Sequence, residues 1–270
     1  MSLAERYDCF LFDLDGVVYR GDRPVPQAPE AITALRTAGR HLVFMTNNSS
    51  LTPEQVADKL VRVGIPASPS EVETSAEVTA QLLAGRGGGT AFVIGEDGIR
   101  TALSRAGITI EDGEPERVDN VVVGWDRAVD YAKLRTASVL VQRGAGLVAT
   151  NADLTYPAAG GLLWPGAGAI LGVVTATTGV SAEVVGKPNP PLFEAALRRA
   201  GGGRPLVVGD RIETDVAGAS ALGWDSLLVL TGVTGASDLA ASGVRPSYVA
   251  RDLSALFEEP EPVPVAGSGS

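Results

Sequence analysis

The stretch Asp8-Cys9-Phe10-Leu11-Phe12-Asp13-Leu14-Asp15-Gly16 decides the fold class of this chain. An apolar run leads without a break into two carboxylates and a glycine, so we expect a strand over 8–12 that ends in a polar turn. A strand without polar alternation is buried on both faces, as in parallel sheets that helices cover on both sides. Open sheets of this kind bind ligands beyond the carboxyl ends of their strands, which is where Asp13 and Asp15 stand.

The alternation of apolar strands with helical patterns continues along the chain. Residues 53–63 predict a helix with Thr52 as its N-cap and Pro53 at the first helical position. Other strands are expected at 41–45, 91–94, 120–123, 146–149, 183–185, 205–208, 226–230 and 248–250, and other helices at 28–38, 98–106, 130–143, 191–200 and 213–222. This order predicts an α/β protein with parallel sheets.

Two segments are candidate domain junctions, the glycine-rich run 85–89 and the stretch 178–182. We therefore expect a core made of residues 1–79 and 183–257, with residues 80–182 inserted as a second α/β unit. Residues 258–270 contain alternating prolines and a Gly-Ser end, so we expect a disordered tail there.

Composition excludes several classes of function. The chain has 270 residues, 22 Lys and Arg against 32 Asp and Glu, and a net charge of -10. This charge argues against nucleic acid or an anionic membrane as the main partner, because both attract basic surfaces.

Cys9 and His41 are the only residues of their types, which excludes an internal disulfide and a zinc site with several histidines. No apolar run approaches the roughly 18 residues of a membrane span. The first residues have no signal-peptide pattern, so we expect a cytoplasmic protein.

Polar clusters directly follow four of the predicted strands. They are Asp13-Leu14-Asp15-Gly16, Thr46-Asn47-Asn48-Ser49, Gly186-Lys187-Pro188, and Gly209-Asp210-Arg211 with Asp215 further on. Because ligand sites form beyond the carboxyl ends of parallel strands, we expect these clusters to converge. Three carboxylates close together repel one another at pH 7 unless a cation joins them, and such oxygen ligands favour Mg²⁺.

This combination of groups suits phosphoryl transfer. Lys187, the hydroxyl of Thr46 and the backbone N–H groups of the turns supply what a tetrahedral oxyanion needs. Asp13 can attack phosphorus while Mg²⁺ and Lys187 offset the repulsion between two anions. Asp15, two residues further on, can protonate the leaving alkoxide.

The four clusters resemble, in the same order, the four motifs of the haloacid dehalogenase (HAD) superfamily. The matching residues are 13–17, 46–49, 186–188 and 209–215. The long insertion between the second and third motifs carries Ala149-Thr150-Asn151-Ala152-Asp153 and Pro165-Gly166-Ala167-Gly168, and it is similar to the cap domain of the NagD-like phosphatases. These include para-nitrophenylphosphatase-like, glycerol-phosphate and phosphoglycolate phosphatases. The resemblance extends to about Arg251 and implies a Rossmann-like parallel-sheet core with an inserted α/β cap domain.

The resemblance also implies a role for each motif. Asp13 would form an aspartyl-phosphate, and Asp15 would act as general acid and then as general base for the attacking water. Mg²⁺ would be held by the carboxylates of Asp13 and Asp210 and by the backbone carbonyl of Asp15. The residues that would bind the phosphate and the substrate are Thr46, Asn47 through its backbone, Asn48 and Lys187.

Three further positions each have two interpretations. Asp215 would orient a metal-bound water or the Lys187 ammonium, or would cap the helix that opens near Thr214. Asn151 and Asp153 would line the substrate pocket from the cap, or would close an Asx-turn after a strand.

Other protein classes fit the motifs less well. A two-component receiver domain combines similar residues but is much shorter, and a dinucleotide-binding module needs a Gly-x-Gly-x-x-Gly turn that residues 85–89 do not form. A phosphomutase of this superfamily usually carries a helical cap after the first motif, where residues 16–23 offer only a short flap. A catalytically weak HAD-fold regulatory binding protein is the non-enzymatic alternative, against which the complete set of acids argues.

We therefore predict a Mg²⁺-dependent phosphoric monoester hydrolase for small phosphorylated metabolites. A sugar or polyol phosphate, glycerol 3-phosphate or phosphoglycolate is the favoured substrate, and a nucleotide or pyridoxal phosphate is the alternative. We expect neither nucleic acid nor membrane as a partner, and the resemblance suggests a homodimer through the cap.

Overall fold

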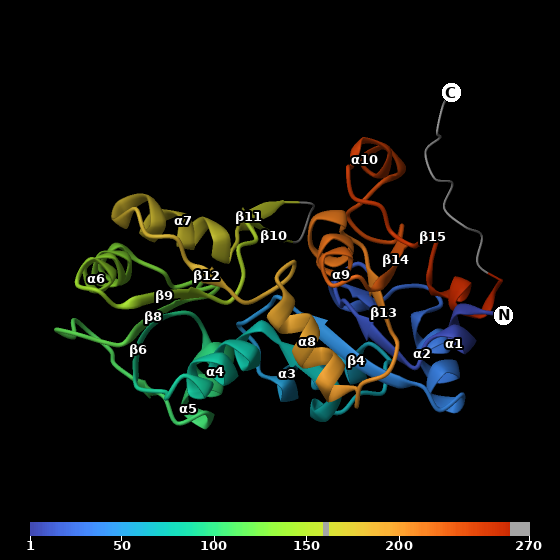
Figure 1. Ribbon diagram of the computed structural model, residues 1–270, viewed down its shortest axis with the longest axis horizontal. Coiled ribbons are helices and arrows are strands. Elements are labelled where there is room, and N and C mark those ends of the chain that lie inside the picture. Colours follow the sequence, from blue (N-terminus) through green and yellow to red (C-terminus); the bar gives the residue numbers. More distant parts are fainter. Residues whose placement is uncertain (159–161, 260–270) are drawn as a thin grey trace. The chain divides into compact units, whose positions relative to one another are not determined.

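The computed structural model describes residues 1–158 and 162–259, apart from the side chains of residues 236 and 240 (Figure 1). Residues 260–270 of the predicted disordered tail therefore lie outside the described residues. Both sheets that carry the fold have parallel strand pairs, so the predicted α/β class is confirmed.

The chain forms two compact units, each assembled from separate segments. Unit 1 comprises Met1–Met45, Ala57–Val72 and the part that starts at Phe193. Unit 2 comprises Thr46–Val56 and Glu73–Leu192. The predicted core with an insertion at 80–182 has different bounds and stays a prediction.

A six-stranded sheet organises unit 1. Its strands are β1 (Cys9–Phe12), β4 (His41–Thr46), β5 (Val72–Thr74), β13 (Pro205–Gly209), β14 (Asp225–Val229) and β15 (Tyr248–Ala250). The last residues of the strands β4 and β5 belong to the segments of unit 2. Their order across the sheet is β15-β14-β13-β1-β4-β5. The central strand β1 pairs in parallel with β13 and β4, so that Phe12 lies opposite Val208 and Phe44. All four residues of β1 are fully buried, which explains the unbroken apolar run of the sequence.

Helices and short turns connect these strands. They are α1 (Leu3–Arg6), α2 (Ala28–Thr37), α3 (Pro53–Arg62), the 3-10 turn η1 (Pro69–Glu71), α8 (Pro190–Arg199), the π-helical turn η3 (Ile212–Val216), α9 (Ala217–Ala221), α10 (Ala236–Ala241) and the 3-10 turn η4 (Leu253–Phe257). The predicted cap of α3 is confirmed, because Thr52 Oγ1 accepts from Gln55 N at 3.3 Å and Gln55 Oε1 accepts from Thr52 N at 2.9 Å. Such reciprocal bonds satisfy backbone donors that the first turn of a helix leaves open.

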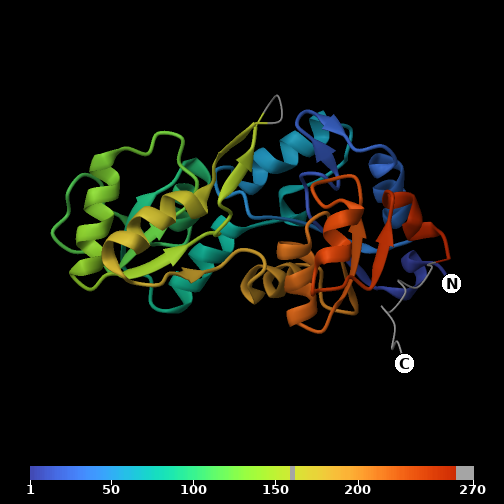
Figure 2. The ribbon, with the colours of Figure 1, turned by 90° about the horizontal axis from the view of Figure 1, so that it is seen from above.

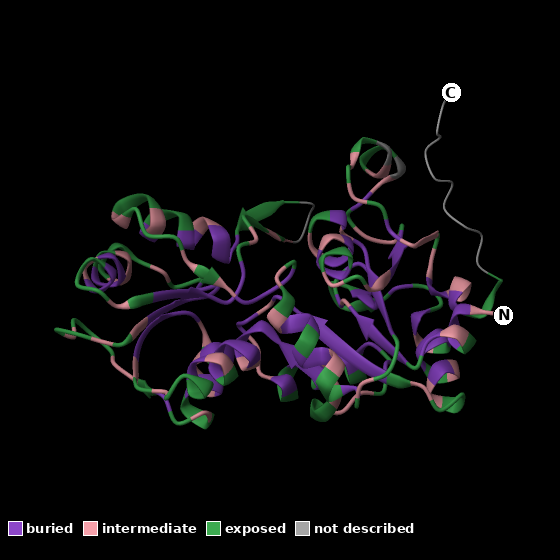
Figure 3. Cartoon of the chain, viewed as in Figure 1, coloured by how far each residue is buried: buried purple, intermediate pink, exposed green. Residues whose placement is uncertain are grey.

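Unit 2 is built on a second parallel sheet with the strand order β12-β9-β8-β6-β7. These strands are β6 (Thr90–Ile94), β7 (Thr109–Ile110), β8 (Asn120–Val123), β9 (Gly146–Ala149) and β12 (Glu183–Val184), and the helices are α4 (Ser75–Gly85), α5 (Asp97–Arg105), α6 (Tyr131–Gln142) and α7 (Ala167–Thr178). Figure 1 shows α6 and α7 on one face of this sheet and α4 and α5 on the other. The strands between them are largely buried (Figure 3), and they supply an apolar core with the inner sides of α6 and α7.

Two short antiparallel ribbons complete the fold. The first consists of β2 (Tyr19–Arg20) and β3 (Arg23–Pro24) and occupies the region where the sequence predicted a short flap. The second consists of β10 (Thr155–Pro157) and β11 (Leu163–Pro165), which form a separate ribbon in unit 2 (Figure 2).

Most predicted elements are present, and the differences are local. The strands at 120–123, 146–149 and 248–250 are confirmed to the residue. The strand predicted at 183–185 pairs with β9 and thus belongs to the sheet of unit 2. The elements that were not predicted are the helices α1, α4, α7 and α10, the strands β5 and β7, and the ribbon β10–β11. Within the described residues, no helix combines the length and the apolar character that crossing a membrane requires.

Candidate active site

Three carboxylates of unit 1 come together at the carboxyl ends of neighbouring strands. Asp13 follows β1 and Asp210 follows β13, which are adjacent parallel strands, while Asp215 comes from η3. One carboxylate oxygen of each residue lies within 4.8 Å of the other two. Asp210 and Asp215 are buried and Asp13 is half-buried. The convergence that the sequence predicted for these acids is therefore present in the structure.

Glycines make room for this acidic group. A Cβ at Gly16 would lie 2.5 Å from Asp210 Oδ2, and side chains at Gly209 or Gly232 would overlap Asp215 or Asp210. Gly16 also has a φ of 86°, a conformation that residues with a side chain rarely adopt. The carboxylates thus depend on close backbone approach at three separate points of the chain.

Backbone donors fix the orientation of two of these acids. Asp210 Oδ2 accepts a hydrogen bond from Val233 N at 2.6 Å, and Asp215 Oδ2 accepts one from Arg211 N at 3.2 Å. Carboxylate oxygens gathered in this way are the ligands that hard divalent cations such as Mg²⁺ and Ca²⁺ prefer, so the donor set fits such an ion.

Asp15 lies in the turn after β1, and its side chain is exposed. The turn is closed by backbone bonds, in which the carbonyl of Leu14 accepts from Val18 N at 2.9 Å and Gly16 N donates to Tyr19 O at 2.8 Å. The Asp15 carboxylate is not part of the acidic group. Its predicted metal contact uses the backbone carbonyl instead and stays a prediction.

The predicted phosphate-binding residues lie in unit 2, where Asn47 connects several segments. Its side-chain amide contacts the backbone of Lys187 on both sides, accepting from Lys187 N at 2.8 Å and donating to Lys187 O at 3.1 Å. The Asn47 carbonyl accepts from Ser75 Oγ at 2.8 Å and from Asn151 Nδ2 at 2.6 Å. Lys187 and Asn47 are both buried, with exposed fractions of 4% and 9%.

Thr46 and Asn48 shape the turn around Asn47. Thr46, the last residue of β4, accepts at Oγ1 a hydrogen bond from Asn48 N at 3.0 Å. The side-chain oxygen of Asn48 accepts from Ser50 N at 2.9 Å and from Ser50 Oγ at 2.7 Å. Both side chains therefore support the turn, and their predicted contacts with phosphate stay predictions.

The Asx-turn that the sequence left open at Asn151 is present. Asn151 Oδ1 accepts a hydrogen bond from Asp153 N at 3.1 Å. The Asp153 carboxylate also accepts from Asn47 Nδ2 at 3.1 Å. These two residues thus fix the loop after β9, and the interpretation that they line a substrate pocket stays a prediction.

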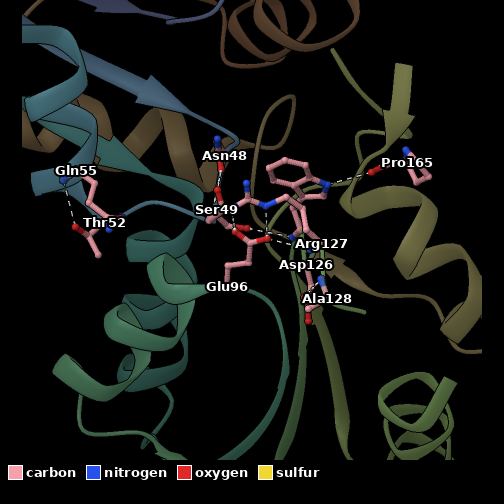
Figure 4. Close-up of polar contacts among 11 residues, drawn as sticks. Asn48, Ser49, Thr52, Gln55, Glu96, Asp126, Arg127, Ala128 and Pro165 are labelled. Atoms are coloured by element: carbon pink, nitrogen blue, oxygen red, sulfur yellow. Dashed lines mark hydrogen bonds and ion pairs between the residues drawn. The ribbon is translucent and has the colours of Figure 1, made fainter. Parts of the chain in front are cut away.

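A second polar group in unit 2 was not predicted. It follows β8, where Arg127 forms a bidentate ion pair with Glu96, with both contacts at 2.7 Å (Figure 4). The Arg127 guanidinium lies 5.2 Å from the centroid of the Trp125 ring. The hydrogen bonds from Arg127 lower the pKa of Glu96 below its ordinary value. The other face of this cluster is aromatic, because Trp125 stacks on Tyr156 with ring centroids 4.0 Å apart. The rule that found the other clusters, polar residues directly after a strand, could also have found this one at 124–127.

A part-buried ion pair between Lys133 and Asp126 supports the loop that carries Arg127. Asp126 is 3% exposed and accepts from Lys133 Nζ and from Ala128 N, each at 2.8 Å. Figure 4 also shows the Ser49 side chain near this loop, where Ser49 Oγ accepts from Trp125 N at 3.4 Å. The second half of the Thr46–Ser50 turn is thus attached to the sheet of unit 2.

Comparison with known proteins gives consistent similarities over almost the whole chain. A family model for haloacid dehalogenase-like hydrolases matches residues 10–109, and a model for HAD-hydrolase-like proteins matches residues 184–256. The chain is 39% identical over 260 residues to the acid sugar phosphatase of Staphylococcus aureus, covering 95% of this chain and 99% of the relative.

Two solved structures illustrate the similarity of fold. The glycerol phosphate phosphatase of Mycobacterium tuberculosis, in complex with magnesium, has a TM-score of 0.89 and 36% identity, over 95% of this chain and 78% of that one. The 4-nitrophenylphosphatase of Thermotoga maritima has a TM-score of 0.89 and 32% identity, over 96% of this chain and 99% of that one.

Proposed function

We propose that this chain, which belongs to the haloacid dehalogenase-like hydrolases as a NagD-like phosphatase, hydrolyses small phosphate monoesters with Mg²⁺ through an aspartyl-phosphate on Asp13. The observation that carries the proposal is the acidic group of Asp13, Asp210 and Asp215, with one oxygen of each within 4.8 Å of the others. The half-buried Asp13 is the most accessible of the three, which suits a nucleophile.

The acidic group defines how the metal would take part. Asp13, Asp210 and the backbone carbonyl of Asp15 would hold Mg²⁺, with Asp215 as a supporting carboxylate. When bound, Mg²⁺ reduces the repulsion between an anionic nucleophile and an anionic phosphate. A magnesium complex of a relative that is 36% identical to this chain supports this assignment.

In the first half of the reaction, the Asp13 carboxylate attacks phosphorus. A P–O bond forms to Asp13, the bond to the leaving oxygen breaks, and Asp15 gives its proton to the departing alkoxide. Asp15 lies two residues beyond the nucleophile in an exposed turn, and the loss of its proton in this step leaves it as the carboxylate that the second step needs.

In the second half, Asp15 accepts a proton from a water that attacks the phosphorus of aspartyl-phosphate. The bond between phosphorus and Asp13 breaks, which releases inorganic phosphate and restores the carboxylate. We assign phosphate binding to Lys187, Thr46, the backbone of Asn47 and Asn48, because anionic oxygens are best stabilised by preorganised donors.

The mechanism is tested by comparing Asp13→Asn with Asp15→Asn. Asp13→Asn removes the nucleophile, so turnover should fall to background with every substrate. In the first turnover, Asp15→Asn should slow the release of an alkoxide leaving group by about 10² to 10⁴ and that of para-nitrophenolate much less, because the phenolate departs without full protonation. It should also accumulate phospho-enzyme, seen by mass spectrometry after acid quench as one added phosphoryl group. Equal losses for both leaving groups, with no trapped adduct, would contradict covalent catalysis by Asp13.

For the substrate we propose a small phosphorylated metabolite, with sugar or polyol phosphates, glycerol 3-phosphate or phosphoglycolate first. The names of the acid sugar phosphatase and glycerol phosphate phosphatase relatives support this choice. Phosphate release across a metabolite panel with Mg²⁺ present tests it by ranking kcat/KM. If nucleotides or pyridoxal phosphate have the higher kcat/KM, they are the favoured substrates instead. If no compound releases phosphate, a regulatory binding protein is the better interpretation.

A further inference from the structure

The side chain of Asn47 holds the backbone of Lys187 on both sides of its Cα. Asn47 Oδ1 accepts from Lys187 N at 2.8 Å, and Asn47 Nδ2 donates to Lys187 O at 3.1 Å. The two residues are 140 positions apart in the sequence, so this contact is a product of the fold. By bonding both the N–H and the carbonyl of Lys187, the Asn47 amide fixes the position and direction of the Lys187 Cα–Cβ bond.

The orientation of the Asn47 amide follows from the chemistry of its partners. Lys187 N can only donate, so it must face the oxygen Oδ1. Lys187 O and the Asp153 carboxylate can only accept, so both must face the nitrogen Nδ2, and the second contact measures 3.1 Å. All polar capacity of Nδ2 is used in these two bonds. Asp153 therefore helps to fix the orientation of the Asn47 amide, and the amide in turn fixes the backbone of Lys187.

Gly186 is shaped for the same contact. A Cβ at position 186 would lie 2.6 Å from Asn47 Oδ1 and 2.5 Å from the backbone oxygen of Thr150. The glycine before Lys187 thus allows the Asn47 oxygen to approach the chain. The neighbouring backbone is fixed as well, because Gly186 N donates to Thr150 O at 2.8 Å.

We propose that Asn47 is a positioning residue for Lys187, and that Asp153 acts through Asn47 in the same chain of contacts. The proposal rests on the proposed function, in which Lys187 binds the transferring phosphate. It gives the Asn47 side chain a task separate from the phosphate contact assigned to its backbone. A lysine has a long flexible side chain, so a displaced backbone would move its ammonium group, and a misplacement of about 1 Å can cost roughly 10² in rate.

The first experiment replaces Asn47 by alanine in the full-length enzyme. Asn47→Ala is neutral, keeps the backbone N–H, and removes the three side-chain bonds. We expect kcat/KM for para-nitrophenyl phosphate to fall by about 10- to 100-fold, and the inhibition constant for inorganic phosphate to rise, because both quantities depend on the position of the Lys187 ammonium group.

The matched control is Ser75→Ala, which removes a buried hydrogen bond of 2.8 Å to the Asn47 carbonyl and leaves the contacts of Lys187 unchanged. It should lower the melting temperature and leave kcat/KM within about twofold of wild type.

A double-mutant cycle separates positioning from a general structural effect. In a Lys187→Met background, Asn47→Ala should lower the remaining activity by less than about twofold, because the group that it positions is already gone. Full additivity of the two losses would overturn the proposal, since Asn47 would then act independently of Lys187. If Lys187→Met itself retains wild-type turnover, the role of Lys187 in the proposed function is wrong. If Lys187→Met loses activity but Asn47→Ala keeps wild-type kcat/KM, the positioning proposal fails and the role of Lys187 in the proposed function stands.

Variants of Asp153 provide a second experiment that can be used if Asn47→Ala does not fold. Asp153→Asn keeps an oxygen that accepts from Asn47 Nδ2, whereas Asp153→Ala leaves the amide without this partner. We expect near wild-type kcat/KM for Asp153→Asn, a loss of about 3- to 10-fold for Asp153→Ala, and no further loss for Asp153→Ala in the Lys187→Met background. Equal losses for both Asp153 variants would overturn the part of the proposal that assigns Asp153 to the amide.

Discussion

The Cβ and carboxyl group of Asp215 occupy the space that a side chain at Gly209 would take, since a Cβ there would lie 2.2 Å from Asp215 Cβ. The strand β13 ends in this glycine, and η3 then returns Asp215 to the strand end. The close approach brings the carboxylate from the turn into the group with Asp13 and Asp210. The geometry of the acidic group therefore depends on the absence of one methyl group.

Gly209→Ala should displace Asp215 and weaken both stability and activity. Overpacking of a buried position costs about 1 to 3 kcal/mol, so the free energy of unfolding should fall by that amount. Urea unfolding and the Mg²⁺ dependence of turnover measure the two effects. The control is Gly172→Ala in α7, where an added Cβ would have no neighbour within 4 Å and should stabilise the helix by up to about 1 kcal/mol. Unchanged Mg²⁺ dependence in Gly209→Ala would separate Asp215 from the metal.

Removal of divalent cations should abolish turnover and lower the melting temperature. Without a cation the carboxylates of Asp13, Asp210 and Asp215 repel one another, and a ligand at 100 times its Kd stabilises a fold by about 2.7 kcal/mol. Thermal unfolding in EDTA and with increasing Mg²⁺ measures this shift, and Asp210→Asn should reduce it. Ca²⁺ should bind yet inhibit, because its longer and looser coordination disturbs the attack geometry. Undiminished hydrolysis after exhaustive chelation would contradict the metal assignment.

Trp125→Phe should loosen the ribbon β10–β11. The indole Nε1 of Trp125 donates to Pro165 O at 3.0 Å, and its ring stacks on Tyr156. Phenylalanine keeps most of the stacking and loses the hydrogen bond, whose net contribution is about 1 kcal/mol. We expect faster exchange of the amides of residues 155, 156, 163 and 164, measured by hydrogen-exchange mass spectrometry, with unchanged exchange in the sheet of unit 1. Unchanged exchange in the ribbon would show that the indole bond does not hold it.

Folding stability should fall in acid partly through Asp225. Burial alone would raise the pKa of this carboxyl, but hydrogen bonds from three neighbours outweigh it and hold the pKa below its ordinary value of 3.8. The donors are Tyr7 at 2.8 Å, Ser247 at 2.8 Å and Arg204 at 2.9 Å.

A carboxylate with a lowered folded-state pKa stabilises the fold above its unfolded pKa and loses that contribution as the pH falls through the folded value. Wild type should therefore lose stability below about pH 4. Asp225→Asn should be less stable at pH 7 and show a shallower loss in acid, which urea titrations at several pH values would measure. Parallel curves for the two proteins would exclude Asp225 as a contributor.

Strands were predictable here because their apolar runs are short and uninterrupted. β8 and β9 have the predicted bounds, and their residues pack inside the sheet of unit 2. The helix α7 was missed because its sequence is rich in glycine, threonine and valine, which have low helix propensity, and its burial against α6 and the sheet compensates for this. The ribbon β10–β11 gave no signal, since its strands are three residues long and mostly exposed.

The sequence predicted the residues whose own side chains form the candidate site. It did not predict a side chain that acts by binding the backbone of another residue. Asp13 and Asp210 directly follow strand ends, so the strand pattern brings them together, whereas η3 brings Asp215 to the same place. The Asn47 side chain contacts a backbone 140 residues away, and no property of the Lys187 side chain signals that contact. Sequence reasoning assigned only the backbone of Asn47 a role for this reason.

The position of β1 between β4 and β13 has a consequence for synthesis on the ribosome. β4 leaves the ribosome soon after β1, but β13 begins only at Pro205, after the whole of unit 2 has been made. The central strand therefore keeps one unpaired edge while the chain for the second sheet is already complete. Since domains generally fold as units during translation, we expect unit 2 to fold first, and Asp13 to gain its neighbour Asp210 among the last events of assembly.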